Sequence, residues 1–155
     1  MVKTLQDEIR QRKPFTSLQQ EASLSVVRTA TALQDAGEEI FKPAGITGTQ
    51  FNVLRILRGA EPDGLCRNAL RDRMLTRMPD VTRLLDRMET AGLVERSREG
   101  DDRRMVSTRI TKEGRRLLDE LDPKVLAFHK RRLSHLTEAQ LRTLINLLAL
   151  VRHAP

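Results

Sequence analysis

The sequence predicts a mainly helical fold of the α+β kind, in which several helices accompany one small β-hairpin. Apolar residues recur every three or four positions through most of the chain, which is the spacing of a single helix face. The spacing changes to every second residue only between 93 and 110, where strands are therefore expected. A chain of 155 residues has about the length of one domain and can form a hydrophobic core without disulfides or a metal.

Residues 1–15 are polar and charged, and we expect them to form a flexible arm that is able to dock on a partner chain. A long helix should begin after Ser17, whose hydroxyl group is suited to cap it. It should end before Pro43, because proline disfavours helical backbone in the preceding residue. Its apolar stripe consists of Leu18, Ala22, Val26, Thr29, Leu33, Ala36 and Ile40.

Two shorter helices follow in the sequence. The first is expected from Thr47 to Arg58, because Thr47-x-x-Gln50 is the pattern of a capping box. Gly59 is suited to end it. After a turn that contains proline and glycine, the second is expected at 67–74.

The next helix has the clearest two-sided pattern. Pro79 is suited to its first position, where a missing N–H group costs nothing, and Ala91-Gly92 should end it. Its buried face is predicted to consist of Val81, Leu84, Leu85 and Met88. Its exposed face is predicted to consist of Asp80, Thr82, Arg83, Asp86, Arg87 and Thr90.

Two strands are predicted at 93–98 and 104–110, where apolar and polar residues alternate. The residues between them are Glu99-Gly100-Asp101-Asp102-Arg103, and these residue types are common in turns. We therefore expect a β-hairpin with a strongly charged tip.

Two further helices are expected towards the C-terminus. Thr111 should cap the first, in which Pro123 should cause a kink or a break, and a capping box at 137–140 opens the second. A small core could not cover all the apolar stripes of the long helices, and monomers avoid large exposed apolar patches. A two-fold dimer would bury the stripes at 18–40, 117–133 and 141–151.

The charge of the chain indicates a polyanionic partner. There are 28 Lys and Arg against 21 Asp and Glu, a net charge of +7. Residues 67–116 hold 14 and 9 of these, a net of +5. A solvated surface would explain a charge run alone, but its coincidence with a helix–turn–helix–hairpin pattern favours duplex DNA. Aromatic residues make up 3% of the chain, without Trp or Tyr, which argues against a stacking platform for single strands or RNA.

The middle of the chain has the order of elements of a winged helix-turn-helix. Two of its motifs resemble those of MarR-family transcriptional regulators, although leucine is usual in that family where this chain has Ile110. The motifs are MPDVTRLLDRME at 78–89 with AGLV at 91–94, and the hairpin pattern Asp102-x-Arg104 with Ile110-Thr111-x-x-Gly114.

This resemblance covers about residues 18–152. It implies a homodimer, with dimerisation helices at 16–45 and 112–155 and a winged-helix DNA-binding region at 46–111. It also implies that a small-molecule or redox signal releases the DNA.

Three residues on the exposed face of the helix that begins at Pro79 are candidates for DNA contacts. In a major groove, Arg83 could bind guanine through two hydrogen bonds, and Thr82 could contact base edges or a thymine methyl group. Arg87 lies one turn further on and is expected to meet phosphate. The alternative is that the two arginines form surface pairs with Asp80, Asp86 or Glu89.

The charged hairpin supplies the other candidates. By resemblance, Arg104 enters the minor groove and Asp102 orients its guanidinium group, although Asp102 would also suit an ordinary turn. Arg96, Arg98 and Arg109 flank the tip, where they would face the DNA backbone or only solvent. The expected DNA-binding residues are Arg77, Thr82, Arg83, Arg87, Arg98, Asp102, Arg103 and Arg104.

A ligand pocket is expected between the long helices and the winged-helix body, because binding there could change the distance between the two DNA-reading helices of a dimer. Phe51, Phe128 and His129 would supply its walls, and Arg28 would bind a small anionic aromatic ligand. The alternative is that these side chains fill the core, which is the more ordinary role for Phe51.

Cys66 is the only cysteine and is expected to be a small buried residue near a helix start. Its alternative role is that of a redox-sensitive thiol, because a helix N-terminus and Arg67 would lower its pKa. A single cysteine also suits a reducing compartment, the cytoplasm.

No pattern of catalytic residues, phosphate-binding loop or cofactor motif is found, and the three histidines are not spaced as a metal set. No apolar run is long enough for a transmembrane helix, and no secretory signal is found, so no membrane partner is expected. The sequence thus predicts a cytoplasmic, non-enzymatic, ligand-responsive repressor that binds pseudo-palindromic duplex DNA as a homodimer. The alternative is a winged-helix protein-interaction module that does not read DNA.

Overall fold

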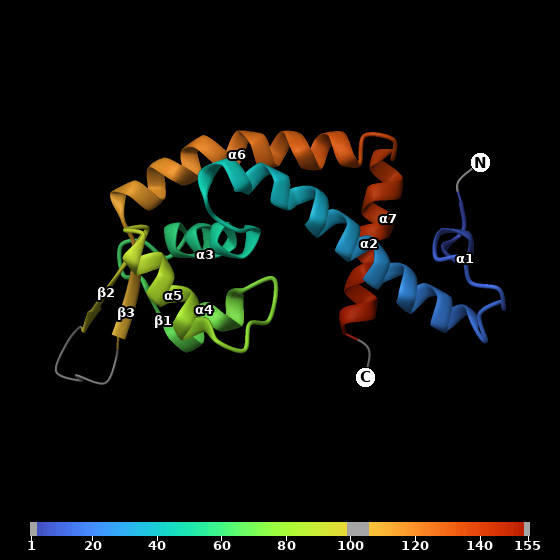
Figure 1. The fold of residues 1–155 in the computed structure, drawn as a ribbon, viewed down its shortest axis with the longest axis horizontal. Coiled ribbons are helices and arrows are strands. Elements are labelled where there is room, and N and C mark those ends of the chain that lie inside the picture. Colours follow the sequence, from blue (N-terminus) through green and yellow to red (C-terminus); the bar gives the residue numbers. More distant parts are fainter. Residues whose placement is uncertain (1–2, 99–105, 154–155) are drawn as a thin grey trace.

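The computed structural model describes residues 3–98 and 106–153. It confirms the mainly helical α+β fold (Figure 1). The strands are β1 (Leu65–Cys66), β2 (Val94–Arg98) and β3 (Val106–Ile110). The helices are α1 (Leu5–Glu8), α2 (Leu18–Phe41), the 3-10 helix η1 (Lys42–Ala44), α3 (Gly48–Arg58), α4 (Arg67–Arg73), α5 (Val81–Thr90), α6 (Lys112–Arg132) and α7 (Glu138–Arg152).

The molecule has a body at one end and long helices that extend from it. Helices α3, α4 and α5 and the sheet form the body, while α2 and α6 extend from it towards the end that holds α1 and α7 (Figure 1). Helix α2 packs against α6, and both pack against α3. The side chain of Arg58 in α3 donates to Asp122 in α6 at 2.7 Å, which joins the body to the long helix.

Four helix starts are as predicted, because a side-chain oxygen satisfies a free backbone N–H group at each of them. The hydroxyl groups of Ser17, Thr47, Thr111 and Thr137 each accept from the backbone N–H three residues later. At Thr47 and Thr137 the side-chain oxygen of the glutamine at that position also accepts from the backbone N–H of the cap residue.

The start of α5 corrects one expectation. Pro79 precedes the helix instead of occupying its first position, and Asp80 is the cap. The Asp80 carboxylate accepts from the backbone N–H of Arg83 at 2.9 Å. An acidic cap satisfies a free N–H group and complements the helix dipole, whereas Met78, which would be the cap if Pro79 began the helix, has no side-chain oxygen to do so.

The sheet contains the predicted hairpin strands and one strand that was not predicted. Strands β2 and β3 pair antiparallel from Val94 opposite Ile110 to Arg98 opposite Val106. The two-residue strand β1 pairs with the other edge of β3, so β3 is the central strand. Before β1, Gly64 has a φ of 76°, and a Cβ atom there would lie 2.5 Å from the carbonyl oxygen of Thr108. Only glycine fits at this point.

The hydrophobic core lies where α3, α4, α5 and α6 meet the sheet. The side chains of Val53, Leu57, Leu70, Met88 and Leu118 are completely buried there. The predicted buried face of α5 is confirmed, since all of its apolar residues belong to this core. Burial of this kind is the main source of stability in a small domain.

Helix α6 runs from Lys112 to Arg132 without the expected break at Pro123, while Figure 1 shows that its axis changes direction along its length. Proline removes the hydrogen bond to the carbonyl group of Asp119. Pro123 and Asp119 are both exposed, so water can hydrate that carbonyl group.

The N-terminal arm contains one helical turn that was not expected. Thr4 and Asp7 form a capping box around α1. The carboxylate of Glu8 lies 3.8 Å from the guanidinium group of Arg28 in α2, which brings the arm close to this helix.

Large apolar side chains of α2 and α7 face outward in the single chain. Leu18 in α2 is 81% exposed, and Ile145 and Leu150 in α7 are 62% and 70% exposed. No residue of α7 is buried. These are the faces for which the sequence predicts burial in a dimer.

Candidate nucleic-acid interface

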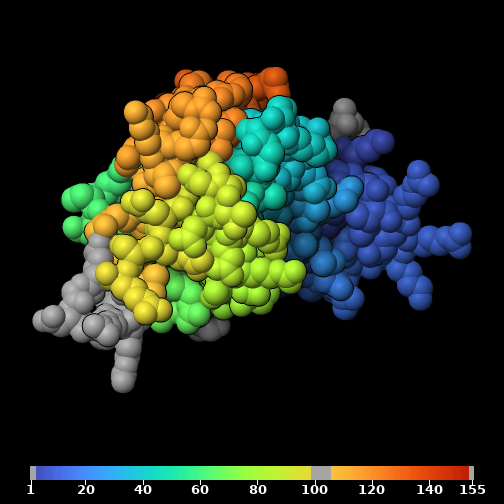
Figure 2. Space-filling model, turned by 60° about the vertical axis from the view of Figure 1, so that its left-hand side comes forward, coloured from blue at the N-terminus to red at the C-terminus, as the bar shows by residue number. Residues whose placement is uncertain are grey.

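Helix α5 presents a polar face beside the sheet. Its exposed residues include Thr82, Arg83, Asp86 and Arg87, as predicted. Strand β2 packs against α5, and Figure 2 shows both on the same face of the molecule. This arrangement places the polar face of α5 and strand β2 on one continuous surface.

Arg96 in β2 binds two carboxylates of α5. Its Nη2 atom lies 2.7 Å from Oδ1 of Asp86 and 2.5 Å from Oε2 of Glu89, and its Nε atom donates to the same Glu89 oxygen at 2.9 Å. The backbone N–H of Arg96 donates to the other Glu89 oxygen at 3.1 Å. Arg96 is therefore an intramolecular clamp, which corrects the expectation that it faces the DNA backbone or only solvent.

The same clamp bears on the alternative roles of Arg83 and Arg87. Their expected surface partners are already engaged, because Asp86 and Glu89 bind Arg96 and Asp80 caps the helix. Within residues 3–98 and 106–153, no ion pair involves Arg83 or Arg87. The two guanidinium groups are thus available for an anionic partner.

The clamp also shifts the ionisation of its members. The hydrogen bond from Arg96 lowers the pKa of Glu89 below its ordinary 4.5, and the hydrogen bond to Glu89 raises the pKa of Arg96. Because the pKa of Glu89 is lower in the folded state, the pair stabilises the fold fully above pH 4.5. That contribution is lost as the pH falls through the folded-state pKa of Glu89.

We therefore expect Glu89→Gln to lower the free energy of unfolding at pH 6 by up to about 1 kcal/mol, a modest effect because the carboxylate is partly exposed. The difference from the parent protein should shrink as the pH falls below 4.5 towards the folded-state pKa of Glu89, because the parent carboxyl group then becomes protonated. Urea unfolding at pH 6 and pH 3.5 measures both values. An equal difference at the two pH values would contradict the assignment of the stabilisation to this ion pair.

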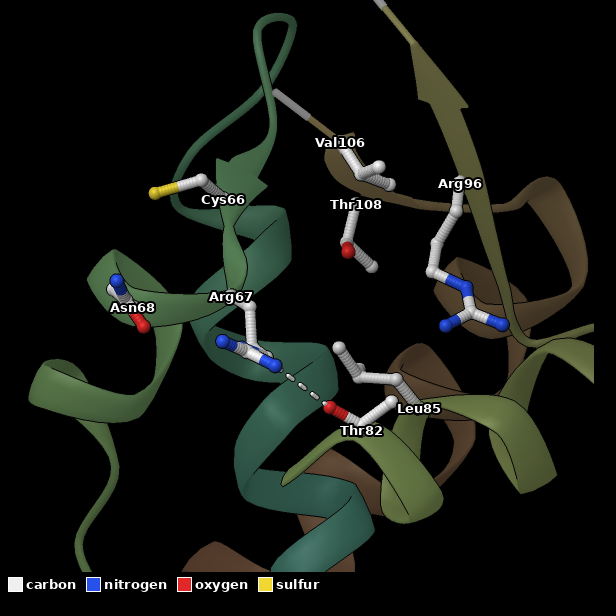
Figure 3. A pocket seen from close by; sticks show the side chains of 8 residues that line it. All are labelled: Cys66, Arg67, Asn68, Thr82, Leu85, Arg96, Val106 and Thr108. Carbon is white, nitrogen blue, oxygen red and sulfur yellow. Dashed lines mark hydrogen bonds between the residues drawn. The ribbon is translucent and has the colours of Figure 1, made fainter. Parts of the chain in front are cut away.

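A pocket of about 390 Å³ lies between α4, α5 and the sheet (Figure 3). Across it, Nη1 of Arg67 donates to the hydroxyl oxygen of Thr82 at 3.1 Å. Arg67 was not assigned to the interface from the sequence. The feature that could have indicated it is its position at the start of a helix in the basic segment. Cys66 lines the same pocket and precedes α4 without a side-chain capping bond. It is half-buried, which corrects the expectation of a buried residue. The lining residues are Cys66, Arg67, Asn68, Thr82, Leu85, Arg96, Val106 and Thr108.

The other predicted DNA-binding residues are spread around this face or lie outside the described residues. Arg77 is exposed in the loop between α4 and α5, and Arg98 is exposed at the end of β2. Arg109 does not reach outward as a wing residue, because its Nε atom donates to the carbonyl oxygen of Pro62 at 2.8 Å. Asp102, Arg103 and Arg104 lie outside the described residues.

Of the four residues expected at a ligand pocket, Phe128 and His129 are neighbours in α6, with ring centroids 5.4 Å apart, but Phe128 is buried and His129 is exposed. Phe51 belongs to the core, where its ring centroid lies 5.0 Å from that of Phe41. Arg28 is exposed on α2 beside Glu8. A hollow of about 200 Å³ lies between α3 and α6, lined by Arg55, Asp122, Val125, Leu126 and His129.

Two structural findings concern other kinds of site. Across the described part of the chain, no three His, Cys, Asp or Glu side chains are grouped so as to hold a metal ion. In the same ranges, no helix combines the length and the apolar character that are needed to span a membrane.

Comparison with known proteins identifies the family. Residues 44–105 match the sequence model of the MarR family. The HTH-type transcriptional regulator FarR of Neisseria gonorrhoeae is 30% identical over 112 residues, which are 72% of this chain and 75% of FarR. The chain belongs to the MarR family. It is therefore a DNA-binding, winged helix-turn-helix member of a family of transcriptional regulators, as the two sequence motifs indicate.

Solved structures of MarR proteins have the same fold. A MarR transcription factor from Planctomyces limnophilus is 39% identical, with a TM-score of 0.67 over 88% of this chain and 99% of that one. MepR of S. aureus, solved in a complex with DNA, is 22% identical, with a TM-score of 0.77 over 91% of this chain and 100% of MepR. At that identity the second likeness concerns the fold alone.

Proposed function

We propose that this MarR protein is a ligand-responsive repressor that binds pseudo-palindromic duplex DNA as a homodimer. One observation carries the DNA part of the proposal: Arg96 engages the carboxylates of α5, so Arg83 and Arg87 keep their guanidinium groups available on its exposed face. Arg83 lies in the first turn of α5 and binds guanine in the major groove, while Arg87 binds phosphate. Thr82 contacts base edges beside Arg83.

The remaining contacts surround α5. Arg77 in the loop before α5 and Arg98 at the end of β2 are exposed and bind the DNA backbone. By resemblance to the family, Arg104 enters the minor groove, with Asp102 orienting it and Arg103 beside it. A narrow minor groove has a strongly negative potential that attracts arginine.

Two substitutions test the division between base reading and wing contacts. We expect Arg83→Ala to weaken binding by about 1–3 kcal/mol and to relax the preference at one base pair per half-site. Arg104→Ala should weaken binding with less loss of base preference and should reduce the salt dependence by about one phosphate contact. Selection of duplexes from a random pool, followed by titrations at several salt concentrations, measures both effects.

Arg116→Ala is the matched control, because this arginine pairs with Glu113 on α6 and is not among the proposed contacts. Identical base preferences for the Arg83 and Arg104 variants would refute the division of roles. Failure of the parent protein to enrich any duplex would favour the protein-interaction module instead.

The exposed apolar faces of α2 and α7 support the homodimer, since association would remove Leu18, Ile145 and Leu150 from water. A two-fold dimer carries one α5 per subunit. Its operator should therefore contain two half-sites about 10 bp apart.

The hollow between α3 and α6 supports the ligand part of the proposal. Arg55 and His129 offer positive and hydrogen-bonding groups, and Val125 and Leu126 offer apolar walls for a small anionic aromatic ligand. A ligand that weakens DNA binding tenfold needs about 1.4 kcal/mol of coupling, and DNA must weaken the ligand by the same factor.

We expect 4-hydroxybenzoate to bind about tenfold more weakly when the operator duplex is present, if this class of ligand is the signal. Calorimetric titrations with and without the duplex measure the two affinities, and Arg55→Ala should weaken both. Equal affinities would exclude this compound as the signal. Release of DNA by an oxidant, abolished in Cys66→Ser, would instead favour the thiol as the sensor.

A further inference from the structure

The charge of α5 is unfavourable for its proposed place on DNA. The helix and its cap residue carry three carboxylates, on Asp80, Asp86 and Glu89, against two guanidinium groups, on Arg83 and Arg87. Taken alone, α5 is therefore net negative. The carboxylates of Asp86 and Glu89 would repel DNA phosphates, since like charges across an interface are costly.

Arg96 brings the missing positive charge to α5 from another element. It reaches both carboxylates from β2, and it is the least exposed of the three groups, at 25% against 54% for Asp86 and 39% for Glu89. Its backbone N–H also donates to Glu89, so both the backbone and the side chain of Arg96 are bound to α5. Figure 3 shows the Arg96 guanidinium group on the α5 side of β2, near Leu85.

We propose that Arg96 is a positioning residue for DNA recognition, which acts by cancelling the charges of Asp86 and Glu89 on the face of α5. The proposal rests on the proposed function, in which α5 faces DNA. In this proposal Arg96 acts on the two carboxylates and not on DNA, because its Nε and Nη2 groups are bound to Glu89 and Asp86. Its removal would expose two carboxylates beside the phosphates and weaken binding through repulsion.

One rescue experiment separates two roles of Arg96: cancelling the charges of the two carboxylates, and only holding β2 against α5. Arg96→Gln removes the positive charge and should weaken binding of a selected 30-bp operator duplex by about tenfold at 0.1 M salt, a loss that shrinks at higher salt because the Debye length shortens. Replacing the two carboxylates as well, in Arg96→Gln/Asp86→Asn/Glu89→Gln, should restore the affinity to within about threefold of the parent. If Arg96 acted only by holding β2 against α5, replacing Asp86 and Glu89 as well would not restore the affinity for DNA.

Two further variants complete the test. Arg96→Lys keeps the charge without the fork of donors and should retain most of the affinity. Arg116→Gln/Glu113→Gln removes an arginine–glutamate pair on α6 and should change the affinity by less than about twofold, because this pair lies outside the proposed contacts. Thermal unfolding of each variant shows which of them are folded under the binding conditions. If Arg96→Gln alone does not fold, the comparison of the triple variant and Arg96→Lys with the parent decides the question.

The outcomes separate the inference from the function on which it rests. Parent-like binding by Arg96→Gln, or a folded triple variant that binds as poorly as Arg96→Gln, would overturn the role of Arg96 alone, provided that Arg83→Ala still weakens binding. If Arg83→Ala binds the operator as tightly as the parent, the proposed placement of α5 fails, and the role of Arg96 fails with it.

Discussion

We expect Gly114→Ala to lower the free energy of unfolding by about 2–3 kcal/mol, the cost of overpacking a filled core. A Cβ atom at this position would lie 2.4 Å from the carbonyl oxygen of Leu93 and 2.8 Å from Cγ1 of Ile110. The first turn of α6 could admit a methyl group only by moving away from the sheet. Urea unfolding at neutral pH measures the loss.

Gly37→Ala is the matched control for this substitution. Gly37 lies inside α2, and a Cβ atom there would meet only Phe128, at an ordinary contact distance of 3.9 Å. Alanine is favoured over glycine in a helix interior by about 0.5–1 kcal/mol, so this variant should be as stable as the parent or more stable. Similar losses in the two variants would show that the close approach of α6 to the sheet is not the cause.

We expect Ile145→Asp in α7 to convert the protein into a 17.7 kDa monomer and to weaken operator binding at least about 100-fold. The side chain is 62% exposed in the single chain, so the substitution costs little within one subunit. In a two-fold dimer the substitution is present in both subunits, so two charges enter an apolar interface. A monomer also loses the gain in affinity that two linked half-site contacts provide.

Light scattering at micromolar concentration and operator titration measure the two effects. Leu75→Asp is the control for mass, because Leu75 is exposed in the loop between α4 and α5 and lies outside the apolar faces of α2 and α7. A parent protein that scatters as a 17.7 kDa species would contradict the dimer directly.

The parts of the fold that sequence predicted are those that depend on local chemistry. Helix faces follow from the spacing of apolar residues, and the caps at Ser17, Thr47, Thr111 and Thr137 follow from a hydroxyl group placed three residues before a free N–H group. The helical turn at α1 has the same signal in Thr4 and Asp7. It was missed because the polar composition of the segment outweighed its capping pattern.

The parts that sequence did not predict depend on contacts between distant residues. Strand β1 has only two residues and exists because β3 offers a free edge to it. The pairing of Arg96 with Asp86 and Glu89 requires the turn at 91–93 to bring β2 back along α5, which no periodicity reveals. The same contact decides which partners remain for Arg83, so the candidate site could be placed on α5 from sequence but its electrostatics could not.

Because α6 continues through Pro123, a single helix connects the sheet to the turn that precedes α7. The helix begins two residues after β3 ends, and it passes the whole body before it reaches the turn into α7 (Figure 1). Its 21 residues correspond to a rod of about 31 Å. A rod of this length that pivots by about 5° at one end moves its other end by about 3 Å. A small rotation at the α7 end would therefore displace β3 by a distance comparable to the length of a hydrogen bond, because the helix between them is not interrupted.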